Sequence, residues 1–399
     1  MLDQPQVTVR SIGDLAPVKS DSLLALIDLA NADSRPEKID VGVGVYRDSA
    51  GNTPILKVMK EAEKRLWESQ ETKAYLGGRG DIRFAELLRP VLLGKHSNDD
   101  RIAGLQTPGG CGALTLGFHL VKAANPDARV FIGMPTWPNH GPIVRGCELE
   151  IVEYQHYDRN SRTLLFDELM GTVKSAEAGD VVLLHGCCHN PTGADLSPDQ
   201  WAEVTAVIAD RGLLPVIDIA YQGFGDGLDA DAAGLRGVLD ACDTVVVAQS
   251  CDKNFGVYRD RVGSVWFKTP SASATATAMG HVLQISREMW SMPPDHGAAA
   301  VRIVLDDPKL NADWRVELDG MRERIASLRQ RLSSVNPLFD YIGDQKGMFS
   351  MLPVSPEQVL DLRERHAIYM ADSGRFNICG LSDEQVDRFA SAVLEVIGG

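Results

Sequence analysis

The most constraining feature of this sequence is a regular alternation of short apolar runs and helical segments that begins at Thr107. The runs that we expect to form strands are Arg129 to Met134, Leu149 to Tyr154, Val181 to His185, Leu213 to Asp218, Thr244 to Ser250 and Gly263 to Phe267. Segments with helical spacing lie near Ala113 to Ala124, Phe166 to Ala176, Pro198 to Asp210 and Leu235 to Ala241. This order predicts an α/β fold, in which a mostly parallel sheet is flanked by helices on both faces.

The chain of 399 residues is long enough for a large domain and a smaller second one. We expect residues 1–18 to form an N-terminal arm, residues 51–321 the large domain, and residues 19–50 with 322–399 a small α+β domain. Further expected elements are helices at Asp21 to Asn31, Pro54 to Glu68 and Trp314 to Leu332, a strand at Lys38 to Tyr46, and an exposed glycine-rich loop at Glu71 to Asp81.

The charge and the cysteines exclude several classes of protein. A formal net charge of −15 leaves no basic face for nucleic acid or for an anionic membrane. The seven cysteines are scattered and form no CxxC pair, which favours free thiols in a reducing cytoplasm. No apolar run reaches the roughly 18 residues of a membrane span, and residues 1–19 lack the apolar core of a signal peptide. We therefore expect a cytoplasmic protein.

A lysine follows one of the predicted buried strands. The run from Thr244 to Ala248 is short and rich in β-branched residues, as in a central parallel strand, and Lys253 lies just beyond it. Ligands of open α/β sheets bind at the carboxyl edge, and an amine among apolar neighbours loses its charge more readily than one in water. Lys253 is therefore a candidate for forming a Schiff base with a carbonyl compound, and the alternative is an ordinary loop lysine.

A second strand end carries two groups that suit a heteroaromatic aldehyde. Asp218 ends the apolar run LLPVI, and Tyr221 follows three residues later. A lysine can form the imine, a buried carboxylate can keep a ring nitrogen protonated, and a phenol can bind a ring hydroxyl. This set favours pyridoxal 5′-phosphate, although Asp218 could instead cap a helix.

A phosphate group needs a cradle, and the stretch QTPGGCGALTLG, from Gln106 to Gly117, offers a glycine-rich turn that runs into an apolar helix. Free N–H groups at such a helix start bind anions. Ser250 and Arg261 would complete the cradle.

The run HGCCHNPTG also contains metal-ligand residue types, namely His185, Cys187, Cys188 and His189. We expect no metal there, because adjacent cysteines should point in different directions and no second ligand pair follows at a suitable distance.

Over nearly its full length the chain resembles the aspartate and aromatic amino-acid aminotransferases, which are fold-type I pyridoxal-phosphate enzymes. The matching stretches are VGVGVYRD (Val41 to Asp48), TKAYLGG (Thr72 to Gly78), TPGG and GAL (Thr107 to Leu114), PTWPNH (Pro135 to His140), HGCCHNPTG (His185 to Gly193), DIAYQGFGDGL (Asp218 to Leu228), KNFGVYRDRVG (Lys253 to Gly263), SMPPDHGA (Ser291 to Ala298), KGMFS (Lys346 to Ser350) and SGRFNICGL (Ser373 to Leu381). The wording of HGCCHNPTG and PPDHGA is most similar to bacterial members that act on aromatic as well as acidic amino acids.

The resemblance implies a cofactor site for pyridoxal 5′-phosphate. Lys253 would bind the cofactor and shuttle a proton, Asp218 would pair with the ring nitrogen, and Tyr221 would contact the ring hydroxyl. The other implied cofactor-binding residues are Gly110, Cys111, Trp137, Asn190, Ser250, Arg261 and Tyr75.

The resemblance also implies a homodimer that exchanges amino groups between amino acids and 2-oxo acids in two half-reactions. Arg375 would bind the substrate α-carboxylate, as a guanidinium fork does well, and Arg287 the distal carboxylate of aspartate or glutamate. Gly44, Trp137 and Asn190 would also border the substrate. Tyr75 and Arg287 would reach across the dimer.

Two positions depart from the family pattern. Cys111 stands where a threonine is usual, and Asp252 stands where a serine is usual. Cys111 removes one good donor to the phosphate, and Asp252 would repel the phosphate if its carboxylate points inward. These departures keep open a binding protein of the same fold without turnover. A further alternative is a lyase or decarboxylase that uses the same cofactor on a dicarboxylic amino acid.

Overall fold

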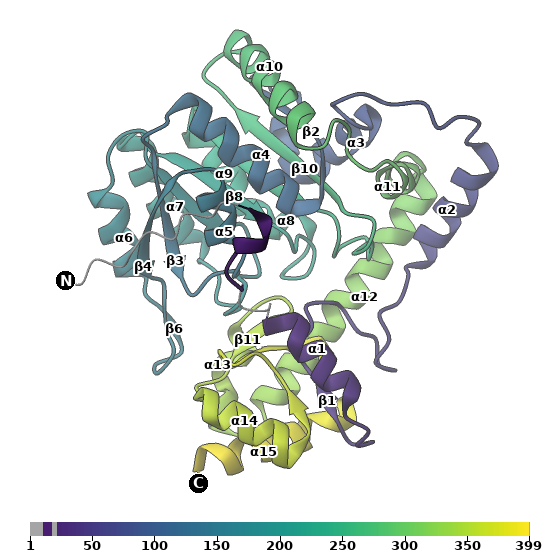
Figure 1. Ribbon diagram of the computed structural model, residues 1–399, viewed down its shortest axis with the longest axis vertical. Helices are drawn as coiled ribbons and strands as arrows, with labels where there is room; N and C mark the ends of the chain where they lie inside the picture. The colour runs from purple at the N-terminus through teal and green to yellow at the C-terminus, as the bar shows by residue number, and fades with distance from the viewer. Residues whose placement is uncertain (1–10, 18–21, 399) are drawn as a thin grey trace.

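The computed structural model describes residues 11–17 and 22–398 (Figure 1). The main sheet consists of β2 (Ile102–Pro108), β3 (Arg129–Met134), β4 (Glu150–Gln155), β7 (Val181–His185), β8 (Leu214–Ile219), β9 (Val245–Ser250) and β10 (Val262–Lys268). Their order in space is β2-β10-β9-β8-β7-β3-β4, and β10 alone runs against its two neighbours. The predicted mostly parallel sheet is confirmed, with most strand ends within one residue of the expected ones. Strand β2 was not predicted.

Helices cover both faces of this sheet, as predicted (Figure 1). One face packs against α4 (Gly109–Ala124), α5 (His140–Gly146) and α10 (Ala272–Met289). The other packs against α3 (Ile82–Leu93), α6 (Phe166–Ser175), α7 (Pro198–Asp210), α9 (Ala233–Ala241) and α11 (His296–Asp306). Strand β9 shows why its sequence is apolar throughout, because Val245 and Val247 enter one core while Val246 and Ala248 enter the other.

A smaller body lies at the bottom of Figure 1. It is built from two parts of the chain, one that begins at Ser22 and one that ends at Gly398. It holds the parallel pair β1 (Ile39–Asp40) and β12 (Ile368–Tyr369), and the antiparallel pair β11 (Phe349–Met351) and β13 (Arg375–Asn377). Its helices are α1 (Ser22–Ala32), α13 (Asp340–Asp344), α14 (Pro356–His366) and α15 (Val386–Gly398). The strand predicted at Lys38 to Tyr46 was wrong in extent, because only Ile39 and Asp40 find a partner strand.

The long helix α12 (Pro308–Ser333) connects the two bodies (Figure 1). Its residues up to Ile325 belong to the core of the upper body, and Leu328 and Leu332 belong to the core of the lower one. The remaining elements are α2 (Lys57–Ser69), α8 (Leu228–Asp231), the pair β5 (Tyr157–Asp158) and β6 (Thr163–Leu164), and 3₁₀ turns at Ile12–Asp14, Gly94–Asn98, Pro337–Phe339, Ile378–Gly380 and Asp383–Gln385. The predicted helices at 54–68 and 314–332 correspond to α2 and α12.

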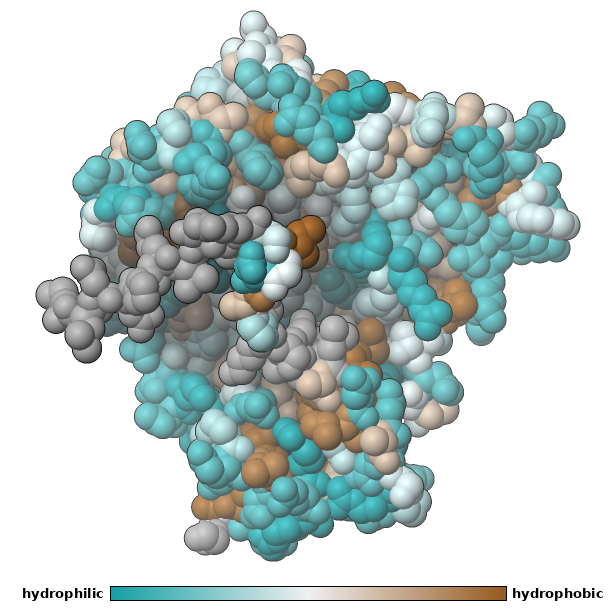
Figure 2. Space-filling view, in the orientation of Figure 1, coloured by the Kyte–Doolittle hydropathy of each residue, from teal (hydrophilic) through white to brown (hydrophobic). Residues whose placement is uncertain are grey.

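Hydrophilic residues cover most of the face seen in Figure 2, and hydrophobic residues gather chiefly over the lower body. Residues 11–17 are exposed, and the rest of the predicted arm, residues 1–10 and 18, lies outside the described residues. Among the described helices none is long and apolar enough to cross a membrane.

The sheet places the chemically important loops together. Strands β3, β7, β8 and β9 are parallel, so their carboxyl ends share one edge. The first residue of β10, Val262, pairs with Pro108 at the end of β2, directly before α4. The loop before β10 and the start of α4 therefore meet the ends of β7, β8 and β9 at this edge.

Candidate active site

A cavity of about 310 Å³ lies at the carboxyl edge of the sheet, facing the lower body. Eleven predicted site residues line it, namely Gly44, Gly110, Cys111, Trp137, Asn190, Asp218, Tyr221, Ser250, Lys253, Arg261 and Arg375. They come from both bodies and from many separate segments of the sequence. The structure therefore brings these residues into one site.

Lys253 is a partly buried amine in the wall of this cavity. Its Nζ donates to Ser250 Oγ at 3.3 Å and lies 5.3 Å from the centre of the Tyr221 ring. Burial lowers the pKa of the Lys253 ammonium, and the Asp252 and Asp218 carboxylates oppose this effect. The amine thus faces the cavity with a lowered cost of losing its proton.

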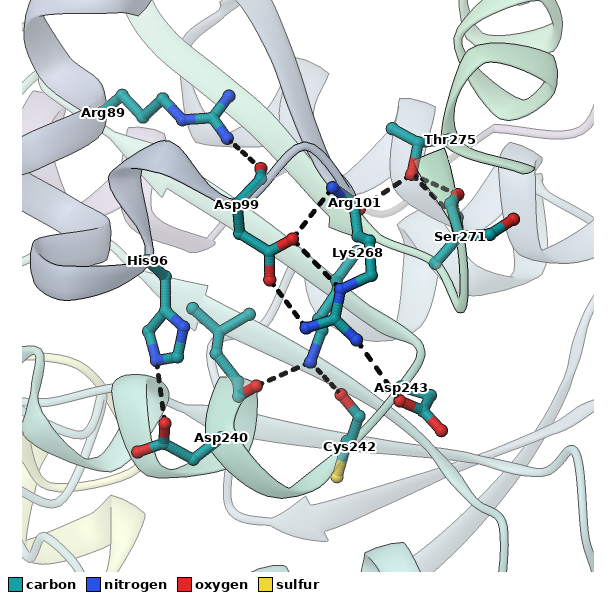
Figure 3. Close-up of polar contacts among 12 residues, drawn as sticks. Arg89, His96, Asp99, Arg101, Asp240, Cys242, Asp243, Lys268, Ser271 and Thr275 are labelled. Carbon is teal, nitrogen blue, oxygen red and sulfur yellow. Dashed lines mark hydrogen bonds and ion pairs between the residues drawn. The ribbon is translucent and has the colours of Figure 1, made fainter. Parts of the chain in front are cut away.

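A second lysine, Lys268, shows what a purely structural buried amine looks like (Figure 3). Its Nζ donates to the backbone carbonyls of Leu239 at 2.7 Å and Cys242 at 2.8 Å, at the end of α9. Burial also lowers the pKa of Lys268. Lys268 lies at the end of β10, on the opposite edge of the sheet, and two carbonyls hold its protons. Burial alone therefore does not distinguish the two lysines, whereas position and partners do.

Asp218 lies at the end of β8 and is 8% exposed. Its Oδ2 lies 2.9 Å from His140 Nε2, and His140 Nδ1 contacts Thr136 Oγ1 at 2.7 Å. Burial opposes ionisation of Asp218, but the His140 hydrogen bond and nearby positive charge hold its pKa below the ordinary value. Asp218 is therefore an ionised carboxylate in a dry wall of the cavity.

Tyr221 and Asn190 form a polar pair beside the lysine. Asn190 Nδ2 donates to Tyr221 Oη at 3.4 Å, and burial raises the pKa of the Tyr221 phenol. The phenol is thus a neutral donor at physiological pH. Asn190 Oδ1 is buried without a hydrogen-bond partner among the described residues. A buried amide oxygen without a partner is costly, so it marks a place for a ligand group.

The opposite end of the cavity is an anion cradle. Helix α4 begins at Gly109 after Pro108, which provides no side-chain cap to the first N–H groups. A Cβ on Gly109 would lie 2.5 Å from Arg261 Nη2, and one on Gly110 would lie 3.1 Å from Ser250 Cβ. Only glycine leaves room here for an anion against the helix start.

The orientation of Asp252, which the sequence left open, is inward. The residue is 1% exposed, its side chain lines the cavity and pairs with Arg261 Nη1, and its Oδ1 accepts the Val262 N–H at 2.9 Å. Burial raises the pKa of Asp252, and Lys253, Arg261 and the Val262 N–H work against that effect. Cys111, the other departure, also lines the cradle.

Arg375 enters the cavity from β13 of the lower body. It is 8% exposed, its Nη2 donates to Gly42 O at 3.0 Å, and its guanidinium lies 4.8 Å from the centre of the Phe349 ring. Arg375 Nε is buried without a partner among the described residues. Gly44 lies beside Phe349, where a Cβ would come within 3.0 Å of the ring. Arg375 is therefore a desolvated cation with capacity to bind a carboxylate.

Two predicted site residues do not line the cavity in the single chain. Tyr75 is 91% exposed, and Arg287 is exposed near the end of α10. Their segments touch, because Leu76 N lies 3.1 Å from Met292 Sδ and a Cβ on Gly78 would lie 3.5 Å from Leu283. Tyr75 and Arg287 thus belong to one outer surface.

The family model for aminotransferases of class I and II matches residues 36–393, which include the whole site. This chain belongs to the class I and II aminotransferases. Among the curated relatives of this aminotransferase, a tyrosine aminotransferase from Rhizobium meliloti (strain 1021) is 47% identical, over 94% of this chain and 97% of that protein. An aspartate aminotransferase from Escherichia coli (strain K12) is 39% identical, over 96% and 99%.

A solved structure of an aromatic-amino-acid aminotransferase from Burkholderia pseudomallei, described as covalently bound to pyridoxal phosphate, superposes on this aminotransferase with a TM-score of 0.93. It is 37% identical and covers 98% of this chain and 100% of that one. The fold and the enzyme class predicted from the sequence are confirmed.

The residues of the cavity fit pyridoxal 5′-phosphate, the cofactor of this family. The unpartnered Asn190 Oδ1 lies beside Tyr221, and the glycine-lined start of α4 leaves space that a Cβ would fill. Lys253 and Asp218 also line this cavity. The donor set therefore suits a ring with a hydroxyl, a basic nitrogen and a phosphate.

The HGCCH run differs in one respect from the expectation. The Cys187 and Cys188 sulfurs and an Asp231 oxygen all lie within 4.8 Å of one another, so the prediction that the two cysteines point apart was wrong. Neither histidine of the run belongs to this group. The Asp231 carboxylate accepts N–H groups from Gly223, Gly225 and Asp226, so it closes a turn.

Sequence reasoning missed the residues that support the site. His140 holds Asp218 across 78 positions in the sequence, although it ends the PTWPNH motif. Tyr258 and Phe349 also line the cavity, and both lie inside quoted motifs. Their presence in those motifs was the available signal.

Proposed function

We propose that this aminotransferase binds pyridoxal 5′-phosphate at Lys253 and transfers the amino group between aspartate, glutamate or aromatic amino acids and 2-oxo acids such as 2-oxoglutarate and oxaloacetate. The observation that carries the proposal is the convergence of Lys253, Asp218 and Arg375 on one cavity. When bound, the cofactor supplies an electron sink for the charge that develops at the substrate Cα.

The chain's own residues have separate tasks. Lys253 binds the cofactor aldehyde and then moves the proton that leaves the substrate Cα. Asp218, held by His140, keeps a proton on the ring nitrogen. Tyr221 and Asn190 bind the ring hydroxyl, Trp137 covers the ring, and Arg375 binds the substrate α-carboxylate.

The proposed substrates are drawn from relatives of two specificities. Relatives named tyrosine and aspartate aminotransferases match with similar coverage. Arg287 is exposed on the outer surface and has no ion-pair partner among the described residues, so its guanidinium could bind a distal carboxylate. An aromatic side chain would take the same place when Arg287 turns away. Parallel assays with L-aspartate and L-phenylalanine as donors test this, and the absence of turnover with phenylalanine would remove the aromatic half.

A homodimer belongs to the proposal. Tyr75 and Arg287 lie on one surface with further exposed apolar residues, among them Leu76 at 47% and Met289 at 37% exposure. A second copy seated on this surface would bring Tyr75 and Arg287 to its own cavity. We also propose that the two bodies are the two domains, and the separate cores on either side of Ile325 and Leu328 support this division.

Replacement of Lys253 tests the proposal most simply. Lys253→Ala should abolish transamination, whereas Lys268→Met, which removes the other buried amine, should lower stability and leave turnover per folded molecule unchanged. Turnover by Lys253→Ala at the wild-type rate would refute the assignment.

A further inference from the structure

The Asp252 carboxylate is paired with Arg261, the cation of the anion cradle. Its carboxylate pairs with Arg261 Nη1 and accepts the Val262 N–H at 2.9 Å, and its own N–H donates to Ser250 Oγ at 3.3 Å. Arg261 and Ser250 are two of the groups that would bind a phosphate. The carboxylate therefore already uses part of the cradle's binding capacity.

The pair stands directly against the start of α4. A Cβ on Gly109 would lie 2.5 Å from Arg261 Nη2 and 3.1 Å from Asp252 Oδ2. An anion that binds the first N–H groups of α4 must consequently come close to both the guanidinium and the carboxylate. Only 2% of the Asp252 side chain is exposed, so its carboxylate lies inside the cradle and not toward solvent.

A phosphate dianion and an ionised carboxylate in such a cradle repel each other strongly. Like charges at short distance raise the affinity of the pair for one proton. Burial disfavours the charged form of Asp252, whereas the uncapped N–H groups at the start of α4 favour an ionised phosphate, so the shared proton belongs on the carboxyl. A protonated carboxyl has the opposite effect, because its O–H donates a short hydrogen bond to an anionic oxygen. In that form Asp252 would do the work of a serine hydroxyl.

We propose that Asp252 makes cofactor binding proton-coupled: when the phosphate of pyridoxal 5′-phosphate enters the cradle, the Asp252 carboxylate takes up one proton from solvent and donates it as a hydrogen bond to the phosphate. The inference rests on the proposed function. The step is an acid–base reaction, in which one O–H bond forms and no electrons are transferred. It follows that the affinity for the cofactor falls as pH rises.

The groups around Asp252 are compatible with this step. Those acting on it are Cys251, Lys253, Tyr258 and Arg261 from its own loop. Cys111 from α4 and Asp218 at the end of β8 line the same cavity. Burial raises the pKa of Asp252 despite two neighbouring cations, so desolvation favours the neutral carboxyl even before an anion arrives. The further negative charge of the phosphate then completes the change.

The test is the dissociation constant for pyridoxal 5′-phosphate, measured from the visible absorption band between about pH 6 and pH 9. We expect the dissociation constant of Asp252→Asn to change less with pH than that of wild type. The ratio of the wild-type constant to the variant constant should rise about tenfold for each pH unit, as one coupled proton requires. Asp252→Ser, which restores a hydroxyl, should behave like Asp252→Asn. Pyridoxal, which lacks the phosphate, should show equal slopes in wild type and variants.

Asp180→Asn is the matched control. Asp180 is 5% exposed and paired with Arg129, but it precedes β7 and so lies at the opposite edge of the sheet. This variant should keep the wild-type slope. Calorimetric titration in buffers of different ionisation enthalpy should show about one more proton taken up by wild type than by Asp252→Asn.

Two results would overturn the inference, and they are distinguishable. Equal slopes and equal proton uptake in wild type and both Asp252 variants would refute proton coupling and leave the proposed function standing. The absence of any cofactor band in wild type and in both variants, each with a native near-ultraviolet spectrum, would refute the proposed function together with the inference.

Discussion

The two ends of the cavity each hold a buried aspartate, and the two carboxylates are in opposite situations. Asp218, at the end of β8, has a pKa below the ordinary value, and Asp252, in the loop before β10, has a pKa above it. Asp218 is held by a histidine whose other nitrogen is fixed by Thr136. Asp252 is held by Arg261, whose side chain is 41% exposed, so water partly screens the charge of the guanidinium.

The difference shows that burial and an opposite charge do not by themselves decide the ionisation of an aspartate. Under the proposed function the ring end requires a permanent negative charge, and the buried hydrogen-bond network of His140 and Thr136 maintains it. The phosphate end receives a dianion, and a carboxylate there is compatible with binding only if it can accept a proton.

The largest effect is expected at the ring end. Asp218→Asn removes the charge that keeps the ring nitrogen protonated, so kcat should fall by about 10²- to 10³-fold, which corresponds to loss of one strong electrostatic contact in a dry site. Cofactor affinity should fall much less, because the phosphate cradle is unchanged. Steady-state kinetics and a cofactor titration on the same preparation measure both quantities. A loss of affinity with an unchanged kcat would reverse the assignment of the two ends.

The second prediction concerns the neutral histidines behind the ring end. His156 is 6% exposed and stacks on His189 with ring centres 4.7 Å apart, and burial lowers its pKa from 6.5 to about 4. As pH falls below about 6.5 the unfolded chain takes up the proton first. The contribution of neutral His156 to the free energy of unfolding is therefore fully present above about pH 6.5. It is lost progressively as the pH falls to about 4.

Urea unfolding of the cofactor-free protein at several pH values tests this. Wild type should lose roughly 2 to 3 kcal/mol more than His156→Phe across this range, since the variant has no proton to bind. Parallel stability curves for the two proteins would contradict the prediction.

The third prediction breaks the pair at the phosphate end. Arg261→Ala leaves the Asp252 carboxylate buried with one partner fewer, which should cost about 1 to 3 kcal/mol after allowance for the exposure of the arginine. Adding Asp252→Asn to this variant should recover most of that stability. A double-mutant cycle in urea gives the coupling between the two residues, and additive losses would mean that they do not interact.

The smallest effect is expected at Cys111. Cys111→Thr provides a better hydrogen-bond donor to the cradle, and the dissociation constant for pyridoxal 5′-phosphate should fall by about 2- to 10-fold. Affinity for pyridoxal should stay unchanged. Equal improvement for both compounds would place Cys111 outside the phosphate contact.

The sequence was most informative where local pattern and tertiary environment agree. Strands β3 and β7 lie at their predicted bounds, because continuous apolar runs are buried on both faces. Strand β2 was missed, since IAGLQTP contains a glycine, polar residues and a proline and shows no regular pattern. The strand predicted at 38–46 was too long, because the extent of β1 depends on pairing with a strand more than 300 residues away, which no local pattern encodes.

The site divides in the same way. Strand ends predicted Lys253 and Asp218, because parallel strands bring their carboxyl ends to one edge. The orientation of Asp252 depends on Arg261, nine residues further along, and on where the loop places that guanidinium. The partnership of Asp218 with His140 depends on the packing of α5 against the sheet. Such contacts arise only from the assembled fold.

We propose that Lys253 binds the cofactor in a site that performs transamination. The most direct measurement is the absorption spectrum of the protein with pyridoxal 5′-phosphate, before and after L-aspartate and then after 2-oxoglutarate. We expect a visible band that requires Lys253, shifts to that of the amine form of the cofactor with aspartate, and returns with 2-oxoglutarate. A band that persists in Lys253→Ala, or one that does not respond to the amino acid, would contradict it.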